Sequence, residues 1–176
     1  MASTSGLALS VTIVQKGKGL ADLRVKLPLA IARGLNEGGE QVRKQVQRSL
    51  LNQTGAINYS SITRRVQVTR AVGGGALSYA IIVAGRPVMK ISEFKWSAGA
   101  KGVQASVWGV SHQFKRSFMV GGAFKARLGS ARLPIRTLYG PNLAKELTRG
   151  ATPAVFAASA RAFVLPAILK HIGSAL

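Results

Sequence analysis

Apolar residues recur at helical intervals between residues 28 and 51 of this 176-residue chain, and this pattern constrains the fold more than any other feature. The spacing predicts a long helix with Pro28 in its first turn, where proline is tolerated. Gly34, Gly38 and Gly39 each lower helix stability by about 1 kcal/mol relative to alanine. We therefore expect these glycines to allow close packing against a sheet or a neighbouring subunit. The apolar residues of the pattern are Ile31, Leu35, Val42, Val46 and Leu50.

The N-terminal segment predicts a strand followed by a loop. Apolar residues alternate with others over residues 7–14, which is the period of a strand. The lysines and glycines of residues 15–20 do not have the spacing of a phosphate-binding loop, so we expect a flexible linker there. No basic residue precedes the apolar stretch, so it lacks the charged start of a secretion signal, and we expect the chain to stay where it is made. The predicted division is a strand and linker over residues 1–21 and a single domain over residues 22–176.

Alternating apolar residues predict further strands in the middle of the chain, separated by glycine-rich turns. We expect these strands to form a central antiparallel β-sheet, packed by the long N-terminal helix and by a C-terminal helix. The predicted fold class is therefore α+β, with an extended N-terminal strand and a proline-rich arm. The predicted strands cover residues 65–72, 77–84, 88–94, 103–110 and 114–120.

The C-terminal helix is predicted over residues 155–172, with Thr152 as its N-cap and a proline at its first position. Its composition is apolar enough to suggest a membrane span. Arg161, Pro166 and Lys170 interrupt the apolar run, and the stretch between the two charges is too short to cross a bilayer. We therefore expect this helix to pack on the sheet or on a neighbouring protein, and we predict no membrane contact.

The chain has few side chains suited to catalysis or to metal binding. It has no cysteine, which excludes disulfides and thiolate metal sites, and its two histidines and five carboxylates are a small set of ligands. We expect no metal, no cofactor and no enzymatic activity. Glu37 and Glu40 lie about one helical turn apart, but a pair of charges on a solvated helix face needs no catalytic role.

The formal net charge is +20, from 25 basic and five acidic residues, and it implies a polyanionic or acidic partner. Residues 61–149 hold 15 of the basic residues and two of the acids, whereas residues 150–176 hold only two basic residues. This distribution is typical of a basic face on a folded body. Aromatic residues interleave with the basic ones, and they either stack on single-stranded bases or fill a core. These aromatic residues are Phe94, Trp96, Trp108, Phe114, Phe118 and Phe124.

The run over residues 133–147 contains rigid turn residues and no side chain with a catalytic repertoire. Pro134 favours an extended or edge conformation, and Gly140-Pro141 predicts a sharp turn. Asn142 and Gly140 are the candidate caps of a short helix with two leucines on its apolar face. Taken alone, the run indicates an ordinary turn from a strand into a helix.

Together, the order of these elements resembles that of the prophage minor tail protein Z family of tailed phages. Three patches within about residues 28–150 carry the resemblance: Ala32-Arg33-Gly34-Leu35-Asn36 in the first helix, residues 85–94, and residues 134–141. In this family the first helix usually continues with an alanine-rich stretch, and Glu37-Gly38-Gly39-Glu40 departs from that pattern.

The resemblance implies a structural protein of the virion, which completes the tail and joins it to the head, in a neck assembled in the host cytoplasm. It implies a homo-oligomeric ring, expected to be a hexamer, around the channel that DNA crosses. The implied neighbours are tail terminator or tail tube proteins and head connector proteins.

A closed ring needs two different patches on each subunit, and we predict that the glycine-rich helix and the proline-rich run supply them. The N-terminal strand is expected to pair with a neighbour's sheet edge. The interface candidates are Arg33, Leu35, Asn36, Pro87, Phe94, Pro134, Ile135, Leu138, Tyr139, Gly140 and Pro141.

Part of the basic surface is expected to face packaged DNA or an acidic protein ring, with ordinary solvated surface as the alternative for any single residue. The alternative function is that of a basic nucleic-acid-binding protein of the ribosomal or nucleoid type. Recognised nucleic-acid motifs are missing, however, and 47% hydrophobic residues is a high share for such a protein. The candidates for DNA or an acidic partner are Arg64, Arg65, Arg70, Lys115, Arg116, Arg127, Arg132 and Arg136.

Overall fold

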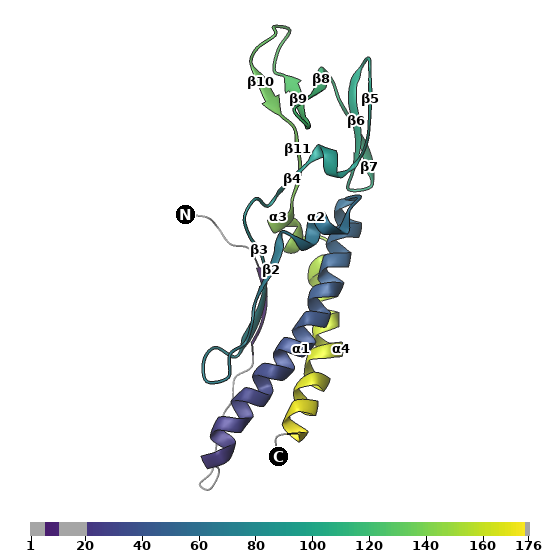
Figure 1. Cartoon of the computed structure of the whole chain (residues 1–176). Coiled ribbons are helices and arrows are strands. Elements are labelled where there is room, and N and C mark those ends of the chain that lie inside the picture. The colour runs from purple at the N-terminus through teal and green to yellow at the C-terminus, as the bar shows by residue number, and fades with distance from the viewer. Residues whose placement is uncertain (1–5, 11–20, 175–176) are drawn as a thin grey trace.

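The computed structural model describes residues 6–10 and 21–174, which form an elongated molecule (Figure 1). Two long helices and a three-stranded sheet occupy one end, which we call the helical body. Two further three-stranded sheets occupy the other end, residues 95–137, which we call the β head. The predicted α+β class is confirmed, with a long N-terminal helix and a C-terminal helix. The linker predicted over residues 15–20 lies outside the described residues.

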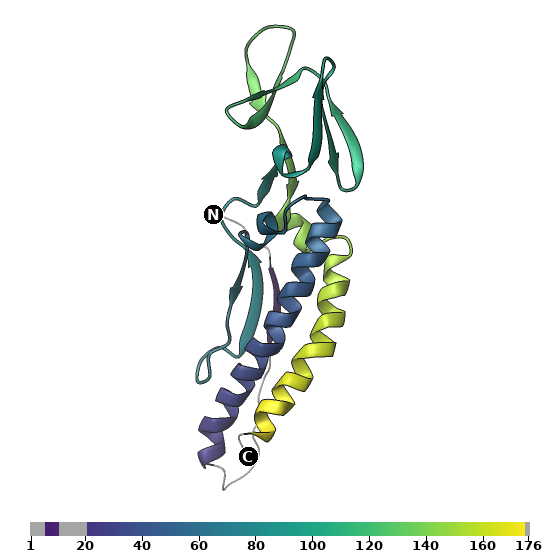
Figure 2. The ribbon, with the colours of Figure 1, turned by 45° about the vertical axis from the view of Figure 1, so that its right-hand side comes forward.

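The long helices α1 (Ala21–Thr54) and α4 (Thr152–Gly173) run antiparallel, side by side, along the helical body (Figures 1 and 2). They approach closely at two glycines. A Cβ atom on Gly34 would lie 2.5 Å from the Cα atom of Ile168, and one on Gly38 would lie 2.7 Å from the Cα atom of Val164. The prediction that these glycines allow close packing is confirmed, but the partner of Gly34 and Gly38 is the chain's own helix α4, and not the sheet or neighbouring subunit that was expected.

The ends of both helices differ from the prediction. Helix α1 begins at Ala21, so Pro28 lies inside the helix and not in its first turn. Helix α4 has Ala151 as its N-cap residue, so the predicted Thr152 cap is wrong by one position. The hydroxyl of Thr152 instead donates a hydrogen bond to Oε1 of Gln53, with 2.9 Å between the oxygens, and ties the start of α4 to the end of α1.

One face of α1 packs on a sheet with the strand order β1-β3-β2 (Gly6–Ser10, Ser78–Val83 and Val66–Thr69). The strand predicted over residues 77–84 is confirmed as β3, which alternates between buried Tyr79, Ile81 and Val83 and half-buried residues. Gly39 of α1 lies against the Tyr79 ring, since a Cβ atom there would be 2.6 Å from it. The predicted N-terminal strand is confirmed over residues 6–10, and residues 11–14 lie outside the described residues. Within this chain β1 pairs with β3 of its own sheet.

The β head consists of two antiparallel sheets, which correct the prediction of one central sheet. They pack together through Trp96 and Phe124, whose ring centroids are 4.9 Å apart in an edge-to-face arrangement. The predicted strand over residues 114–120 is interrupted by a turn at Lys115 and Arg116, which separates two strands of different sheets, so only residues 117–120 form one of the strands. The first sheet contains β5 (Lys95–Gly99), β6 (Gly102–Val107) and β7 (Val110–Phe114), and the second contains β8 (Ser117–Val120), β9 (Ala123–Arg127) and β10 (Ile135–Thr137).

A two-stranded ribbon connects the body and the head. Strand β4 (Val88–Lys90) leads through the short 3-10 helix η1 (Ile91–Glu93) into the head, and β11 (Tyr139–Asn142) returns from it. The predicted turn at Gly140-Pro141 is therefore wrong, because both residues lie in β11, where the register with β4 is irregular. The predicted helix after it is confirmed as α3 (Leu143–Leu147), and both of its end leucines are fully buried.

Side chains from several elements lock the head onto the body. The Asn142 side chain caps α3 by accepting a hydrogen bond from the backbone N–H of Ala144 at 3.0 Å. Next to it, Glu146 accepts hydrogen bonds from the Trp108 indole at 3.1 Å and from Gln53 at 2.6 Å. The short helix α2 (Tyr59–Thr63) packs beside them on α1. A continuous core runs from Val164 of the body to Phe124 of the head.

Candidate functional site

Positive charge is concentrated in the β head. Residues 95–137 contain eight lysines and arginines and no aspartate or glutamate. All of these basic side chains are exposed except that of Lys125, which is half-buried. They are Lys95, Lys101, Lys115, Arg116, Lys125, Arg127, Arg132 and Arg136.

None of these head cations pairs with a carboxylate among the residues that the structure describes. The ion pairs found there join Arg43 and Arg70 to Glu40, Arg65 to Glu93, and the C-terminal end of α4 to Glu37. Charges that lack a nearby counter-ion repel one another and attract a polyanion. The β head is therefore the part of the described chain that is best suited to a negatively charged partner.

The open face of the β8-β9-β10 sheet combines cations with an aromatic ring. Phe118 lies opposite Lys125, and Arg127 lies opposite Ile135, so all four side chains belong to one face. The Arg127 guanidinium carbon lies 5.7 Å from the centre of the Phe118 ring. The other face is turned inward, because Phe124 is 2% exposed and packs on Trp96.

Five of the eight residues predicted to meet DNA or an acidic partner lie in the head. Lys115 and Arg116 form the turn between β7 and β8, and the backbone N–H of Arg127 donates to the Arg116 carbonyl at 3.3 Å. Arg132 lies in the connection between β9 and β10, and Arg136 lies on β10. The fold thus brings together residues that span more than twenty positions in the sequence.

The other three predicted residues make contacts within the chain. Arg65 donates two hydrogen bonds to the Glu93 carboxylate, at 2.9 and 2.8 Å, and it is largely buried. Arg64 donates to the carbonyl of Ser60 at 3.2 Å, and Arg70 donates to Glu40 at the same distance. Arg65 and Arg70 thus link elements of the body, whereas the bond of Arg64 is local to the end of α2 and its side chain is exposed.

The Glu93 carboxylate has a depressed pKa. Burial acts to raise this pKa, but the hydrogen bonds from Arg65 and from the backbone N–H of Lys90 outweigh it, so the pKa of Glu93 lies below its ordinary value. The charged form is thus the one that the fold stabilises. Arg65 and Glu93 connect β2 to the entry of the β head.

Most of the predicted interface residues are used inside the chain. Leu35 and Phe94 are fully buried, Leu138 is 7% exposed and Pro141 is also buried, so they are core residues in this fold. Asn36 exchanges hydrogen bonds with the backbone of Ala71, and the Pro87 carbonyl accepts a hydrogen bond from Leu143. Gly140 packs on the Phe94 ring, where a Cβ atom would lie 2.8 Å from it. The exposed members of the set are Arg33, Pro134, Ile135 and Tyr139.

Glu37 and Glu40 face different partners and hold different elements. Glu37 accepts hydrogen bonds from Lys170 and His171 of α4, and these contacts lower the pKa of its carboxyl. Glu40 binds Arg43, Arg70 and the Tyr79 hydroxyl. Burial acts to raise the pKa of Glu40, and Arg43 outweighs it. Burial, together with the nearby Glu40 carboxylate, raises the pKa of the Tyr79 hydroxyl.

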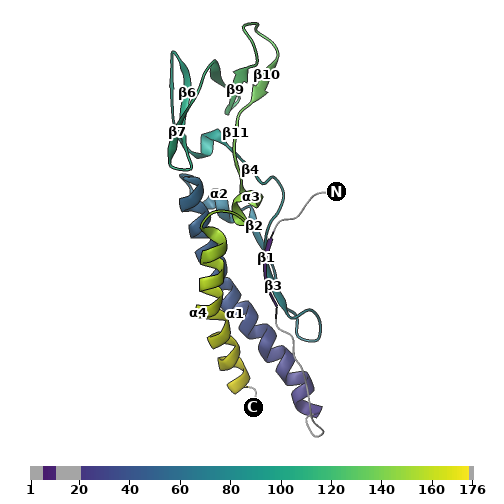
Figure 3. The same ribbon diagram turned by 180° about the vertical axis from the view of Figure 1, so that it is seen from behind.

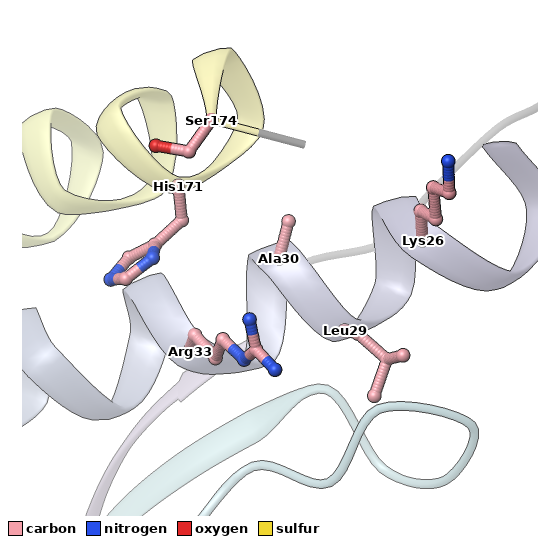
Figure 4. Close-up of a pocket in the computed structure, with 6 residues that line it drawn as sticks. All are labelled: Lys26, Leu29, Ala30, Arg33, His171 and Ser174. Carbon is pink, nitrogen blue, oxygen red and sulfur yellow. The ribbon is translucent and has the colours of Figure 1, made fainter. Parts of the chain in front are cut away.

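A cavity of about 370 Å³ lies between the ends of α1 and α4 (Figure 4). Its lining includes three groups that can carry positive charge, but they do not converge on one point. Lys26 and Arg33 extend away from each other on α1, and His171 is held by Glu37 at 2.7 Å. We therefore do not place a site for an anion in this cavity.

The aromatic residues mainly fill the core of the head. Phe94 and Phe124 are buried, and Phe114 and Phe118 are half-buried. The remaining pair, Trp96 and Trp108, keep about half of their surface exposed, at 43% and 47%. The interpretation that strand-spaced aromatics fill a core describes Phe94, Phe114 and Phe124, whereas Phe118 lies beside Arg127.

Three of the head cations were not among the residues predicted to meet DNA or an acidic partner. They are Lys95, Lys101 and Lys125, and the fold places them at the same end of the molecule as the predicted ones. The sequence did contain a signal, because the acid-free stretch covers the whole head. Within the described residues no group of histidine and acidic side chains is arranged to hold a metal ion.

Comparison of the chain with models of protein families, with curated proteins and with solved structures gave no match.

Proposed function

We propose that this chain is a structural subunit of a tailed-phage virion that completes the tail and joins it to the head. The subunits form a ring, with a hexamer as the expected number, around the channel through which DNA passes. The neighbours in this arrangement are a tail terminator or tail tube protein on one side and head connector proteins on the other. The proposal extends the resemblance of residues 32–36, 85–94 and 134–141 to the prophage minor tail protein Z family.

The observation that best supports this proposal is the separation of two kinds of surface along an elongated molecule. The cations of the β head lie at one end, and the helical body, with α4 outermost, lies at the other (Figure 1). A subunit of a DNA channel needs one surface for a polyanion and other surfaces for its neighbours. The head meets packaged DNA or an acidic protein ring, and the body carries the contacts between subunits.

A basic nucleic-acid-binding protein of the ribosomal or nucleoid type is the second candidate. The unpaired cations of the head favour it, and the Arg127 and Phe118 pair is of the kind that contacts bases or phosphates. The two functions differ in assembly, because such a binding protein acts as a monomer or dimer, whereas a neck protein forms a ring. Native mass spectrometry separates them by the number of chains in each particle.

The test of the phage function is genetic. Deleting the gene from a phage genome that carries it is expected to yield DNA-filled heads and separate tails in the lysate, as seen by negative-stain electron microscopy. Supplying the gene in trans is expected to restore joined particles. A deletion strain that still produces complete, infectious particles would contradict the proposal.

A further inference from the structure

The outer face of α4 carries an apolar seam along most of the helix. Its five residues follow one another at intervals of four, four, three and four positions, which keeps them on one side of a helix. All five are exposed, and two of them are leucines that are 59% and 58% exposed. The seam is about 22 Å long at the rise of an α-helix. It consists of Ala154, Ala158, Ala162, Leu165 and Leu169.

This seam makes α4 apolar on both sides. The opposite side of the helix packs on α1 through Val164 and Ile168. Only 22% of the most apolar 18-residue window of α4 is buried within the chain. A helix that is apolar all round is normally covered all round, by protein or by lipid. Within residues 6–10 and 21–174, no element covers the outer side of α4.

A membrane is a poor partner for this helix, although α4 is long and apolar enough to cross one by length and composition. Helix α1 runs beside α4 from Gly34 to Ser49, where Ser49 and Thr152 lie within hydrogen-bond distance. In that stretch α1 exposes the charged residues Glu37, Lys44 and Arg48, which a bilayer core would have to accommodate. Three of the five seam residues are alanines, which add little to insertion in a membrane surface but allow close protein contact.

The outer face of the β1-β3-β2 sheet is a second surface without charge. Tyr79 and Ile81 point toward the body, so the alternate residues of β3 point outward. Ala80 lies opposite Ala8 on one side and Thr69 on the other, which forms an uncharged row across the sheet. The outward residues are Gly6, Ala8 and Ser10 on β1, Ser78, Ala80 and Ile82 on β3, and Gln67 and Thr69 on β2.

These two uncharged surfaces lie on different sides of the molecule. In the views of Figures 1 and 2, α1 lies between the sheet and α4, and the view from behind in Figure 3 also shows the sheet and α4 on opposite sides. Two copies of a chain with a net charge of +20 can approach closely only where their surfaces carry little charge. Opposite placement of such surfaces suits a head-to-tail contact that repeats from copy to copy.

We propose that the outer seam of α4 in one copy docks on the outer face of the β1-β3-β2 sheet in the next copy. Each sheet is then covered by helices on both faces, and each α4 is covered on both sides. This contact specifies how neighbouring subunits of the proposed ring meet, and its biological role rests on that proposed function. The contact itself can be tested on the isolated protein, without a phage.

A symmetric contact between two α4 helices is disfavoured by the position of Arg161. This residue lies at the margin of the seam and near its midpoint. In an antiparallel pair of identical helices the two Arg161 side chains would meet close to the symmetry axis, and like charges there oppose association. The uncharged sheet face contains no such group.

Cysteine cross-linking tests the contact directly, because the chain has no cysteine of its own. The variants are Ala158→Cys on the seam, Ala80→Cys on the sheet, and the double variant. With a bis-maleimide reagent, the double variant is expected to give a ladder of dimers, trimers and higher species on a denaturing gel. Each single variant is expected to remain at the monomer position, and a mixture of the two single variants is expected to stop at dimers.

A charge substitution provides an independent readout. Leu165→Glu is expected to abolish the assembly measured by light scattering and to leave the circular dichroism spectrum unchanged. Leu128→Glu is the matched control, because it makes the same change at a leucine of the β head that is 58% exposed. Assembly of the unmodified protein is expected to increase with salt, since salt screens the repulsion between the positively charged copies.

Three outcomes would overturn the proposal. They are dimers from Ala158→Cys alone, a monomer in light scattering at every salt concentration, and binding to lipid vesicles that Leu165→Glu removes. The test is separate from that of the phage function. If the double variant gives a ladder but the deletion strain still makes complete virions, the contact is upheld and the phage function is contradicted. If the deletion strain fails to join heads and tails but no ladder forms, the phage function is upheld and the contact is contradicted.

Discussion

At the scale of single residues, Gly140 has a different role from the one that its sequence context indicates. The neighbouring proline predicts a turn that a subunit interface could use, whereas the structure places Gly140 in a strand against the fully buried Phe94 ring. Because Gly140 has no side chain, the backbone of β11 can lie directly against the Phe94 ring. Sequence could not reveal this, because Phe94 is more than forty positions away and meets Gly140 only in the folded chain.

We predict that Gly140→Val destabilises the fold and not only an assembly. The added side chain would overlap the Phe94 ring, and overpacking of this kind costs about 1–3 kcal/mol. Urea denaturation followed by circular dichroism measures the change. Gly129→Val is the control, since a Cβ atom there has no neighbour within 4 Å. Equal stability of the two variants would show that a side chain at position 140 fits beside the Phe94 ring, and would contradict this prediction.

The Arg65 and Glu93 pair gives a prediction for pH dependence. Because the folded-state pKa of Glu93 lies below the unfolded value of about 4.5, its contribution is complete above that value and is lost as the pH falls through the folded-state pKa. At neutral pH, Glu93→Gln is expected to lower the free energy of unfolding by about 2 kcal/mol. The difference from the unmodified protein should shrink in acid.

Denaturation curves at neutral and acid pH measure this difference. Glu37→Gln is the control, because it removes an exposed carboxylate that also has a depressed pKa and that binds Lys170 and His171. It should have a smaller effect at neutral pH. A Glu93→Gln effect that stays constant down to strongly acid conditions would contradict the assigned role of the ion pair.

At the scale of elements, the helices could be predicted from sequence better than the strands could. Apolar spacing located both long helices, and the glycines of α1 signalled a close contact. The identity of that contact required the fold, because Val164 and Ile168 lie more than 120 positions after the glycines that they meet. The strands over residues 95–99, 123–127, 135–137 and 139–142 were not predicted, and the last two span only three and four residues, which is too short for a periodic pattern.

The helix contact predicts an unusual response to alanine. Inside a helix, alanine is more favourable than glycine by about 1 kcal/mol, yet Gly38→Ala is expected to lower the melting temperature. Its Cβ atom would lie 2.7 Å from the Cα atom of Val164, so the two helices would have to separate. Differential scanning calorimetry measures the shift.

Gly173→Ala is the matched control for that substitution. It lies at the end of α4, where a Cβ atom has no neighbour within 4 Å, and it should leave the melting temperature unchanged or raise it. If Gly38→Ala raised the melting temperature as well, the two helices would not be held together through this glycine.

At the scale of the whole molecule, the net charge could be predicted from the sequence, but the concentration of unpaired cations at one end of the molecule could not. The head collects cations from strands and turns over residues 95–137 and contains no acid. All five acids lie outside it, and four of them make contacts that link elements. Composition cannot show which cations are free to bind a partner. Arg65 was predicted to do so, but in the folded chain it pairs with Glu93, which lies 28 positions away.

We predict that DNA binding by the purified protein depends on the head. Reversing Arg127, Arg132 and Arg136 to glutamate is expected to weaken binding by more than tenfold and to lower the slope of log affinity against log salt by about 3, one for each lost phosphate contact. Fluorescence anisotropy over a salt series measures both quantities.

Reversal of Arg33, Lys44 and Arg48 on α1 is the control, because it changes the net charge of the chain by the same amount. This variant should bind nearly as tightly as the unmodified protein. Equal losses in both variants would indicate attraction by net charge alone, and affinity that does not respond to salt would point to a protein partner for the head.

The pairing of α1 with α4 also determines when this chain can fold during its synthesis. Glu37 and His171, which meet across the two helices, are separated by 134 residues. A ribosome therefore releases α1 long before α4 has been synthesised, and the face of α1 that carries Gly34 and Gly38 stays uncovered until then. Contacts between distant parts of a chain form slowly and leave apolar surface exposed in the meantime. The helical body thus folds only after α4 has emerged, and truncation within α4 would leave the emerged chain without a stable body.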